Sequence, residues 1–126
     1  MRILVIEDDV KVGRLLEQIL QEEGYDVEWA QDGQEAISMG LEGHYDLILL
    51  DYMLPTRSGP QVAQQLRANG RTTPILMLTA RDAPEDIRLC LSSGVNDYLT
   101  KPFRFEDLLD KIGSLAGRVS SGGWSV

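Results

Sequence analysis

Several polar side chains in this sequence stand directly after short apolar segments, where they could together carry out phosphoryl chemistry. Glu7 and Asp8 follow one apolar segment, and Asp51 follows another. The hydroxyl of Thr79 and the amine of Lys101 stand at the ends of two later segments. An aspartate becomes a nucleophile toward phosphorus when a metal ion and an ammonium group screen the phosphoryl oxygens. We expect Asp51 to attack, Lys101 to hold charge and Thr79 to donate a hydrogen bond.

The three acids of this set indicate a divalent cation. Glu7, Asp8 and Asp51 cannot lie close together as bare anions unless one pKa rises or a cation neutralises them. Mg²⁺ takes about six oxygen ligands and keeps several waters, so one or two carboxylates and a phosphate complete its shell. We therefore expect Mg²⁺ as the cofactor of this site.

Strands must end immediately before these residues, and apolar runs of strand length alternate with amphipathic stretches. Strands are predicted at residues 3–6, 25–30, 47–50, 75–79 and 97–100. The first helix has apolar residues at helical spacing and stops at Gly24, and Asp32 can cap a second helix that ends near Gly43. The third is a short helix closed by Asn69-Gly70. Asp82 and Pro84 signal the fourth, through Leu91, and the last carries one apolar face: Phe105, Leu108, Leu109, Ile112 and Leu115.

This alternation predicts an α/β fold, a doubly wound five-stranded parallel sheet with helices on both faces. Two strand orders are plausible for five βα units, and we adopt 2-1-3-4-5, the order of flavodoxin and CheY. Ligands bind at the carboxyl ends of strands in such sheets. The order brings Glu7, Asp8, Asp51 and Thr79 together at the point where the winding reverses.

Each of these residues also has a purely structural interpretation. Asp8 or Asp9 could cap the helix that begins near Val10, and Asp51 could initiate a turn before Pro55. Thr79 and Lys101 alone would be unremarkable. The functional interpretation depends on finding all of these residues together: two acids after the first strand, an acid after the third, a hydroxyl after the fourth and a lysine after the fifth.

Composition sets the broad class of the protein. The chain has 126 residues, a formal net charge of −8 and a single cysteine, which is typical of one soluble domain without a disulfide framework. The negative charge disfavours contact with nucleic acid or anionic lipid, and no run is long enough to span a membrane. We expect a cytoplasmic domain that contacts neither nucleic acid nor a membrane.

Four motifs resemble response-regulator receiver domains of two-component signalling, most closely the OmpR/PhoB type that carries a winged-helix DNA-binding effector: residues 6–9 (IEDD), 49–55 (LLDYMLP), 78–81 (LTAR) and 97–103 (DYLTKPF). The resemblance covers residues 1–118 with the correct spacing. Residues 119–126 are similar to a flexible tail or to the start of a linker leading to an effector domain.

The resemblance implies a role for each residue of the pocket. Asp51 is the phosphoacceptor, Lys101 contacts the phosphoryl group, and the Lys101–Pro102 bond is cis. Mg²⁺ is bound by Glu7, Asp8, Asp51 and the backbone carbonyl of Met53. The implied phosphoryl donor is a phosphohistidine on a sensor histidine kinase, and the domain is a signalling phosphoacceptor rather than an enzyme acting on other substrates.

The resemblance also implies a switch, in which Thr79 moves toward the phosphoryl group and Tyr98 fills the vacated space. This movement then changes the surface formed by the fourth helix, the strand at 97–100 and the last helix. That surface controls an output, expected to be transcription. Subfamily members dimerise there through salt bridges, but most of the expected charges are absent. A homodimer through this surface would have atypical contacts: Ile87, Asp97 and Lys111.

Two other functional classes are considered. A haloacid dehalogenase-type phosphohydrolase needs a second acid two residues after the nucleophile, where this chain has Met53. A receiver-shaped module that signals without phosphate, as an interaction module or constitutive dimer, is the stronger alternative because the output surface is altered. Metal-dependent phosphorylation of Asp51 distinguishes the three classes.

Overall fold

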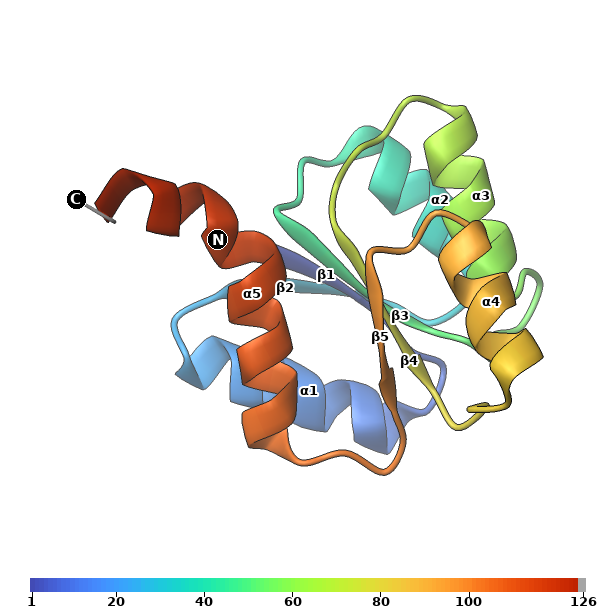
Figure 1. The fold of residues 1–126 in the computed structure, drawn as a ribbon, viewed down its shortest axis with the longest axis horizontal. Helices are drawn as coiled ribbons and strands as arrows, with labels where there is room; N and C mark the ends of the chain where they lie inside the picture. Colours follow the sequence, from blue (N-terminus) through green and yellow to red (C-terminus); the bar gives the residue numbers. More distant parts are fainter. Residues whose placement is uncertain (125–126) are drawn as a thin grey trace.

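Strands and helices alternate along the whole chain in the computed structural model, which describes the backbone of residues 1–124 and the side chains of residues 1–116 (Figure 1). The elements are β1 (Arg2–Ile6), α1 (Val10–Glu22), β2 (Asp26–Ala30), α2 (Gly33–Glu42), β3 (Leu47–Asp51), α3 (Gly59–Ala68), β4 (Ile75–Thr79), α4 (Pro84–Ser92), β5 (Asp97–Thr100) and α5 (Phe105–Trp124). Every predicted strand and helix is present, with small differences in their ends.

The five strands form one parallel sheet in the order β2-β1-β3-β4-β5, which confirms the predicted topology. Ile6 lies beside Leu50, and Thr79 lies beside Thr100 in the strand register. The carboxyl ends of β1, β3, β4 and β5 therefore meet at one edge. Residues following these strands are placed together although they are far apart in sequence.

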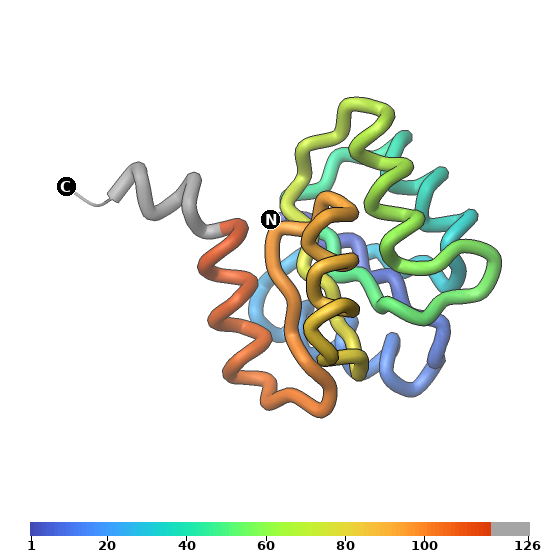
Figure 2. Tube along the Cα trace, turned by 45° about the vertical axis from the view of Figure 1, so that its right-hand side comes forward, coloured from blue at the N-terminus to red at the C-terminus, as the bar shows by residue number. Residues whose placement is uncertain are grey.

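The sheet separates two apolar cores. One core joins the strands to α2, α3 and α4, and the other joins them to α1 and α5. Figures 1 and 2 show these two groups of helices on opposite sides of the sheet. β3 and β4 are buried along their whole length because helices cover both faces, which explains their uninterrupted apolar sequences.

Local sequence signals explain most of the helix starts. Asp32 caps α2 as predicted by accepting from the Glu35 backbone N–H, and Ser58 and Gln61 form a reciprocal capping box at α3. α4 begins differently: Pro84 occupies its first turn, and the capping residue Ala83 offers no side-chain hydrogen bond. Asp82, expected to signal this start, lies one residue before the cap.

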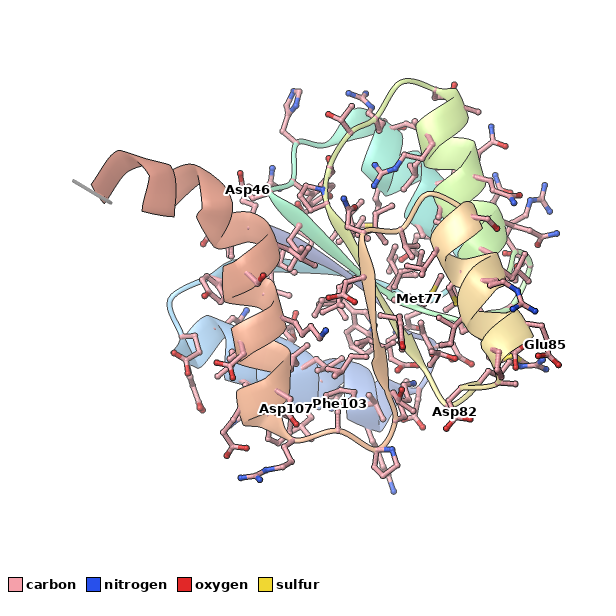
Figure 3. All side chains as sticks on the ribbon, viewed as in Figure 1. Asp46, Met77, Asp82, Glu85, Phe103 and Asp107 are labelled. Atoms are coloured by element: carbon pink, nitrogen blue, oxygen red, sulfur yellow. The ribbon has the colours of Figure 1, made fainter. Side chains whose placement is uncertain are left out.

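The two edges of the sheet differ in what they present. Figure 3 shows Asp82 and Phe103 at the lower edge, beyond the ends of β4 and β5, and Asp46 at the upper edge, before β3 begins. The lower edge holds the candidate site.

The predicted tail at residues 119–126 lies outside the residues whose side chains are described, so the boundary at residue 118 stays a prediction.

Candidate functional site

Three carboxylates from two strand ends form a cluster at this edge. Glu7 and Asp8 follow β1, and Asp51 is the last residue of β3. One oxygen of each lies within 4.8 Å of the others, so the structure brings together all three predicted acids. Glu7 is 2% exposed and Asp51 7% exposed, whereas Asp8 is open to solvent. Two buried acids with an exposed third one form a pocket that is open on one side.

Asp8 and Asp9 differ in role because one of them caps the start of α1. Asp9 is the capping residue, and its carboxylate accepts from the backbone N–H groups of Lys11 at 2.9 Å and Val12 at 3.2 Å. The backbone N–H of Asp9 itself donates to the Glu7 carboxylate at 3.2 Å. Capping therefore occupies Asp9 and leaves the Asp8 carboxylate available to the pocket.

Lys101 joins the buried acids. Its ammonium Nζ donates to Asp51 Oδ1 at 3.0 Å and lies 3.4 Å from Glu7 Oε1. The Lys101–Pro102 bond is cis, as the resemblance implied. Lys101 follows β5, so its side chain reaches past the end of β4 to meet acids carried by β1 and β3. A positive charge is thus held beside the Asp51 carboxylate.

The electrostatics of Glu7 reflect its crowding. Burial and the neighbouring Asp51 carboxylate raise the pKa of Glu7 from 4.5 to about 7, although the Asp9 N–H and the Lys101 ammonium act in the opposite direction. Desolvation and a like charge both disfavour the ionised form of a carboxylic acid. Near pH 7 the Glu7 carboxyl group is therefore only partly ionised in the metal-free protein.

Lys101 itself stays charged. Burial alone would lower its pKa, but the hydrogen bond and ion pair with Asp51, together with Glu7, outweigh that effect and raise the pKa above its ordinary value. The ammonium group is therefore protonated at all physiological pH values. It can stabilise negative charge that develops next to Asp51.

Thr79 is fully buried at the end of β4, and its hydroxyl contacts the following loop. Thr79 Oγ1 accepts from the Arg81 backbone N–H at 2.8 Å and lies 3.4 Å from the Arg81 carbonyl oxygen. The guanidinium carbon of Arg81 in turn lies over the Tyr52 ring, 5.4 Å from its centroid, and an Arg81 guanidinium nitrogen is 3.7 Å from the Asp86 carboxylate of α4. The Thr79 hydroxyl is thereby linked to the start of α4.

The remaining predicted residues lie around the pocket. Met53 lies two residues after Asp51 and is 59% exposed. Its predicted metal ligand is the backbone carbonyl oxygen, not the side chain. Tyr98 is half-buried on β5, pairs in register with Met77, and packs against the core beneath α4. The structure thus places Tyr98 on the strand next to the one that carries Thr79, on the side of the sheet that α4 covers.

On the predicted output surface, Asp97 and Lys111 pair with each other within the chain at 2.8 Å. Ile87 is half-buried, while Leu89 and Leu91 of α4 are exposed. The charges that remain from the expected dimer pattern are therefore already paired internally.

Sequence reasoning missed two contributors to the site. Trp29 of β2 donates its indole N–H to the Glu7 carbonyl oxygen at 2.8 Å. Arg81 links Thr79 to Tyr52 and Asp86. Trp29 belongs to none of the four motifs, and although Arg81 ends the motif at 78–81, only the packing of the loop after β4 reveals its contacts.

The donor set suits Mg²⁺. Carboxylate oxygens are the ligands that hard divalent cations prefer, and three of them converge here. Burial, and after it the neighbouring Asp51 carboxylate, disfavours the ionised form of Glu7, so a cation placed among the acids would offset that penalty. The residues present therefore fit a divalent cation.

Comparisons with known proteins agree with this geometry. The model of the response regulator receiver domain family matches residues 3–113. Transcriptional regulatory protein PcoR of Escherichia coli is 42% identical over 120 residues, which are 95% of this chain and 53% of PcoR. The chain spans about half the length of the curated relatives it matches.

Solved structures show the same fold. The receiver domain of the Francisella response regulator 1452 has a TM-score of 0.89 and 35% identity, covering 94% of this chain and 98% of that one. The receiver domain of sensor histidine kinase PA1611 from Pseudomonas aeruginosa PAO1 has a magnesium ion coordinated in its active site cleft. It has a TM-score of 0.85 and 36% identity, covering 92% of this chain and 97% of that one.

Among the residues that the structure describes, no helix combines the length and the apolar character that crossing a bilayer requires.

The family match, the relatives and the acidic pocket all indicate the same protein family. This chain belongs to the response regulator receiver domain family, the signalling phosphoacceptors of two-component systems.

Proposed function

We propose that the domain accepts a phosphoryl group on Asp51 from a phosphohistidine of a sensor histidine kinase. The observation that carries the proposal is the Lys101 ammonium group, 3.0 Å from Asp51 within a cluster of three carboxylates. This arrangement places a nucleophile, a fixed positive charge and a set of metal-binding oxygens at one open edge. Phosphoryl transfer depends mainly on such positioning and electrostatic stabilisation.

In the proposed reaction, a carboxylate oxygen of Asp51 forms a bond to phosphorus. The bond from phosphorus to the donor's imidazole nitrogen breaks, and its electron pair stays on that nitrogen. Lys101 stabilises the negative charge of the phosphoryl oxygens in the transition state and afterwards. The burial of Asp51 limits the access of water to the resulting acyl phosphate.

Glu7, Asp8, Asp51 and the Met53 carbonyl are the proposed Mg²⁺ ligands. When bound, Mg²⁺ supplies positive charge that screens the phosphoryl oxygens from the acids. Glu7 must give up its proton to serve as a ligand, since its pKa is about 7 in the absence of metal.

The proposed switch starts at Thr79. To donate a hydrogen bond to a phosphoryl oxygen, Thr79 must turn its hydroxyl hydrogen away from the Arg81 carbonyl oxygen, which lies 3.4 Å from Oγ1. Tyr98, half-buried on the neighbouring strand, is the residue proposed to fill the space that Thr79 leaves. Phosphorylation then biases an equilibrium between two arrangements of the α4-β5-α5 surface.

The donor protein must reach Asp51 at the open edge. Leu15 of α1 and Phe105 of α5 are exposed there, and together with Lys101 they line a mainly apolar groove of about 430 Å³. An apolar groove beside the reacting groups can hold a partner protein while transfer takes place. This position supports the proposed encounter with the kinase.

The proposed output is transcription, in line with the longer relative PcoR, which is a transcriptional regulatory protein; the effector itself is proposed to bind DNA. A homodimer through α4-β5-α5 is part of the proposal. Asp97 and Lys111 are paired within the chain, and the half-buried Ile87 with the exposed Leu89 and Leu91 provides apolar contacts instead.

Intact-protein mass spectrometry tests the function. Incubation with acetyl phosphate and Mg²⁺ should add one phosphoryl group to the wild type, but none to Asp51→Asn. The matched control is Asp26→Asn, the same change at an exposed position where β2 begins, and it should be modified like the wild type. Light scattering on the same samples reports dimerisation.

Modification of Asp51→Asn at the wild-type rate would contradict the assignment. No modification of the folded wild type under any Mg²⁺ concentration would instead favour the phosphate-independent interaction module.

A further inference from the structure

We propose that Trp29 is a positioning residue for the metal-binding acids, acting through the backbone of Glu7. The inference rests on the proposed Mg²⁺ site and deepens it. Trp29 lies on β2 and coordinates nothing itself, but its indole N–H donates to the Glu7 carbonyl oxygen at 2.8 Å.

The backbone of Glu7 is held on both sides by β2. Its N–H donates to the Ala30 carbonyl oxygen at 3.0 Å, and its carbonyl accepts from the neighbouring residue Trp29. The Glu7 carbonyl belongs to the peptide plane that leads to Asp8. Fixing this plane fixes the direction in which the chain leaves β1, and with it the positions of both acids.

The indole can reach that carbonyl because α1 has no side chain in its path. A Cβ atom built at Gly13 would lie 2.7 Å from the indole Nε1 and closer still to two ring carbons. Real Cβ atoms do not approach so closely, so the ring would have to move away. Gly13 and Trp29 therefore form one unit, in which the missing side chain of one residue admits the ring of the other.

Gly13 would otherwise be an unfavourable choice. Glycine inside a helix is less favourable than alanine because it loses more backbone freedom on folding. Gly13 lies in the first turns of α1 and has an ordinary helical hydrogen bond to the Asp9 carbonyl, so no turn requires glycine there. The close approach of Trp29 is the feature of the structure that accounts for it.

The partly buried position of Trp29 is consistent with this role. Its ring packs against the core beneath α1 and α5, while its polar nitrogen points at the loop that carries the acids. A phenylalanine could fill most of the same space but has no donor. Trp29→Phe thus separates packing from positioning.

Calorimetric titration of the metal-free protein with Mg²⁺ alone tests the inference, without any phosphoryl donor. Trp29→Phe should weaken Mg²⁺ binding by about tenfold, as loss of a hydrogen bond that orients a ligand typically does. Gly13→Ala should weaken it similarly by displacing the ring. The matched control is Gly113→Ala on α5, where a Cβ meets nothing within 4 Å, and its Mg²⁺ affinity should equal that of the wild type.

Melting temperatures separate positioning from general stability. A purely structural role would lower the melting temperature and leave the Mg²⁺ dissociation constant of the folded protein unchanged. That result for both Trp29→Phe and Gly13→Ala would overturn the inference while leaving the proposed function intact. A wild-type protein that binds no Mg²⁺ would overturn the metal assignment and this inference together.

Discussion

Replacing Glu7 with glutamine should stabilise the metal-free protein at alkaline pH, but not at acidic pH. Glu7 is 2% exposed, and its pKa rises from 4.5 to about 7 on folding, first through burial and then through the Asp51 carboxylate. At about 1.4 kcal/mol per pKa unit, this shift corresponds to about 3 kcal/mol of lost stability once Glu7 is ionised. Glutamine keeps the shape of the protonated acid and cannot ionise.

The sign follows from proton binding. The folded state binds the Glu7 proton more tightly than the unfolded state, so the stabilisation is fully present below pH 4.5. It is lost as the pH rises from 4.5 through about 7, and it stays lost above that. The free energy of unfolding of Glu7→Gln should therefore exceed that of the wild type by an amount that grows across this window.

Urea unfolding in the presence of a chelator measures the difference at about pH 5 and about pH 8.5. The matched control is Glu23→Gln, an exposed acid whose side chain makes no contact in the site, and its difference from the wild type should be small at both pH values. A Glu7→Gln difference that does not grow with pH would mean that folding does not raise the pKa of Glu7. So would a variant less stable than the wild type at alkaline pH.

Three further changes test other parts of the site. Because Mg²⁺ must displace the Glu7 proton, its affinity should weaken by up to about tenfold per unit below pH 7; calorimetry that shows a constant dissociation constant would contradict this. Lys101→Ala leaves two buried carboxylates without their cation and should cost about 2 kcal/mol at alkaline pH, allowing for partial exposure of the lysine. Urea unfolding checks this, and an unchanged midpoint would argue against the ion pairs. Asp9→Ala removes the cap of α1 and should cost about 1 kcal/mol of unfolding free energy, whereas an unaltered thermal midpoint would mean that the cap is dispensable.

The fold could be predicted because its determinants are local. Continuous apolar runs such as Leu47–Leu50 predict buried parallel strands, and Gly24 and Asp32 mark where one helix stops and the next begins. Five such units leave few topologies, and the carboxyl ends of the strands then bring Asp51 and Lys101 to one edge.

Details that depend on neighbours in space could not be predicted. The sequence alone did not decide between Asp8 and Asp9 as the helix cap, because both stand near the start of α1 and only the backbone path separates them. The pairing of Asp97 with Lys111 depends on how α5 lies across β5. The contact of Trp29 with Glu7 depends on a space left at a distant residue, which no local pattern encodes.

Identification of the modified residue is the sharpest test of Asp51 as the phosphoacceptor. The protein is treated with acetyl phosphate and Mg²⁺, the acyl phosphate is reduced with borohydride, and peptides are analysed by tandem mass spectrometry. Borohydride converts a phosphorylated aspartate to homoserine, so we expect homoserine at position 51 and at no other acid. Homoserine at Asp8 or another acid, with Asp51 unchanged, would contradict the account.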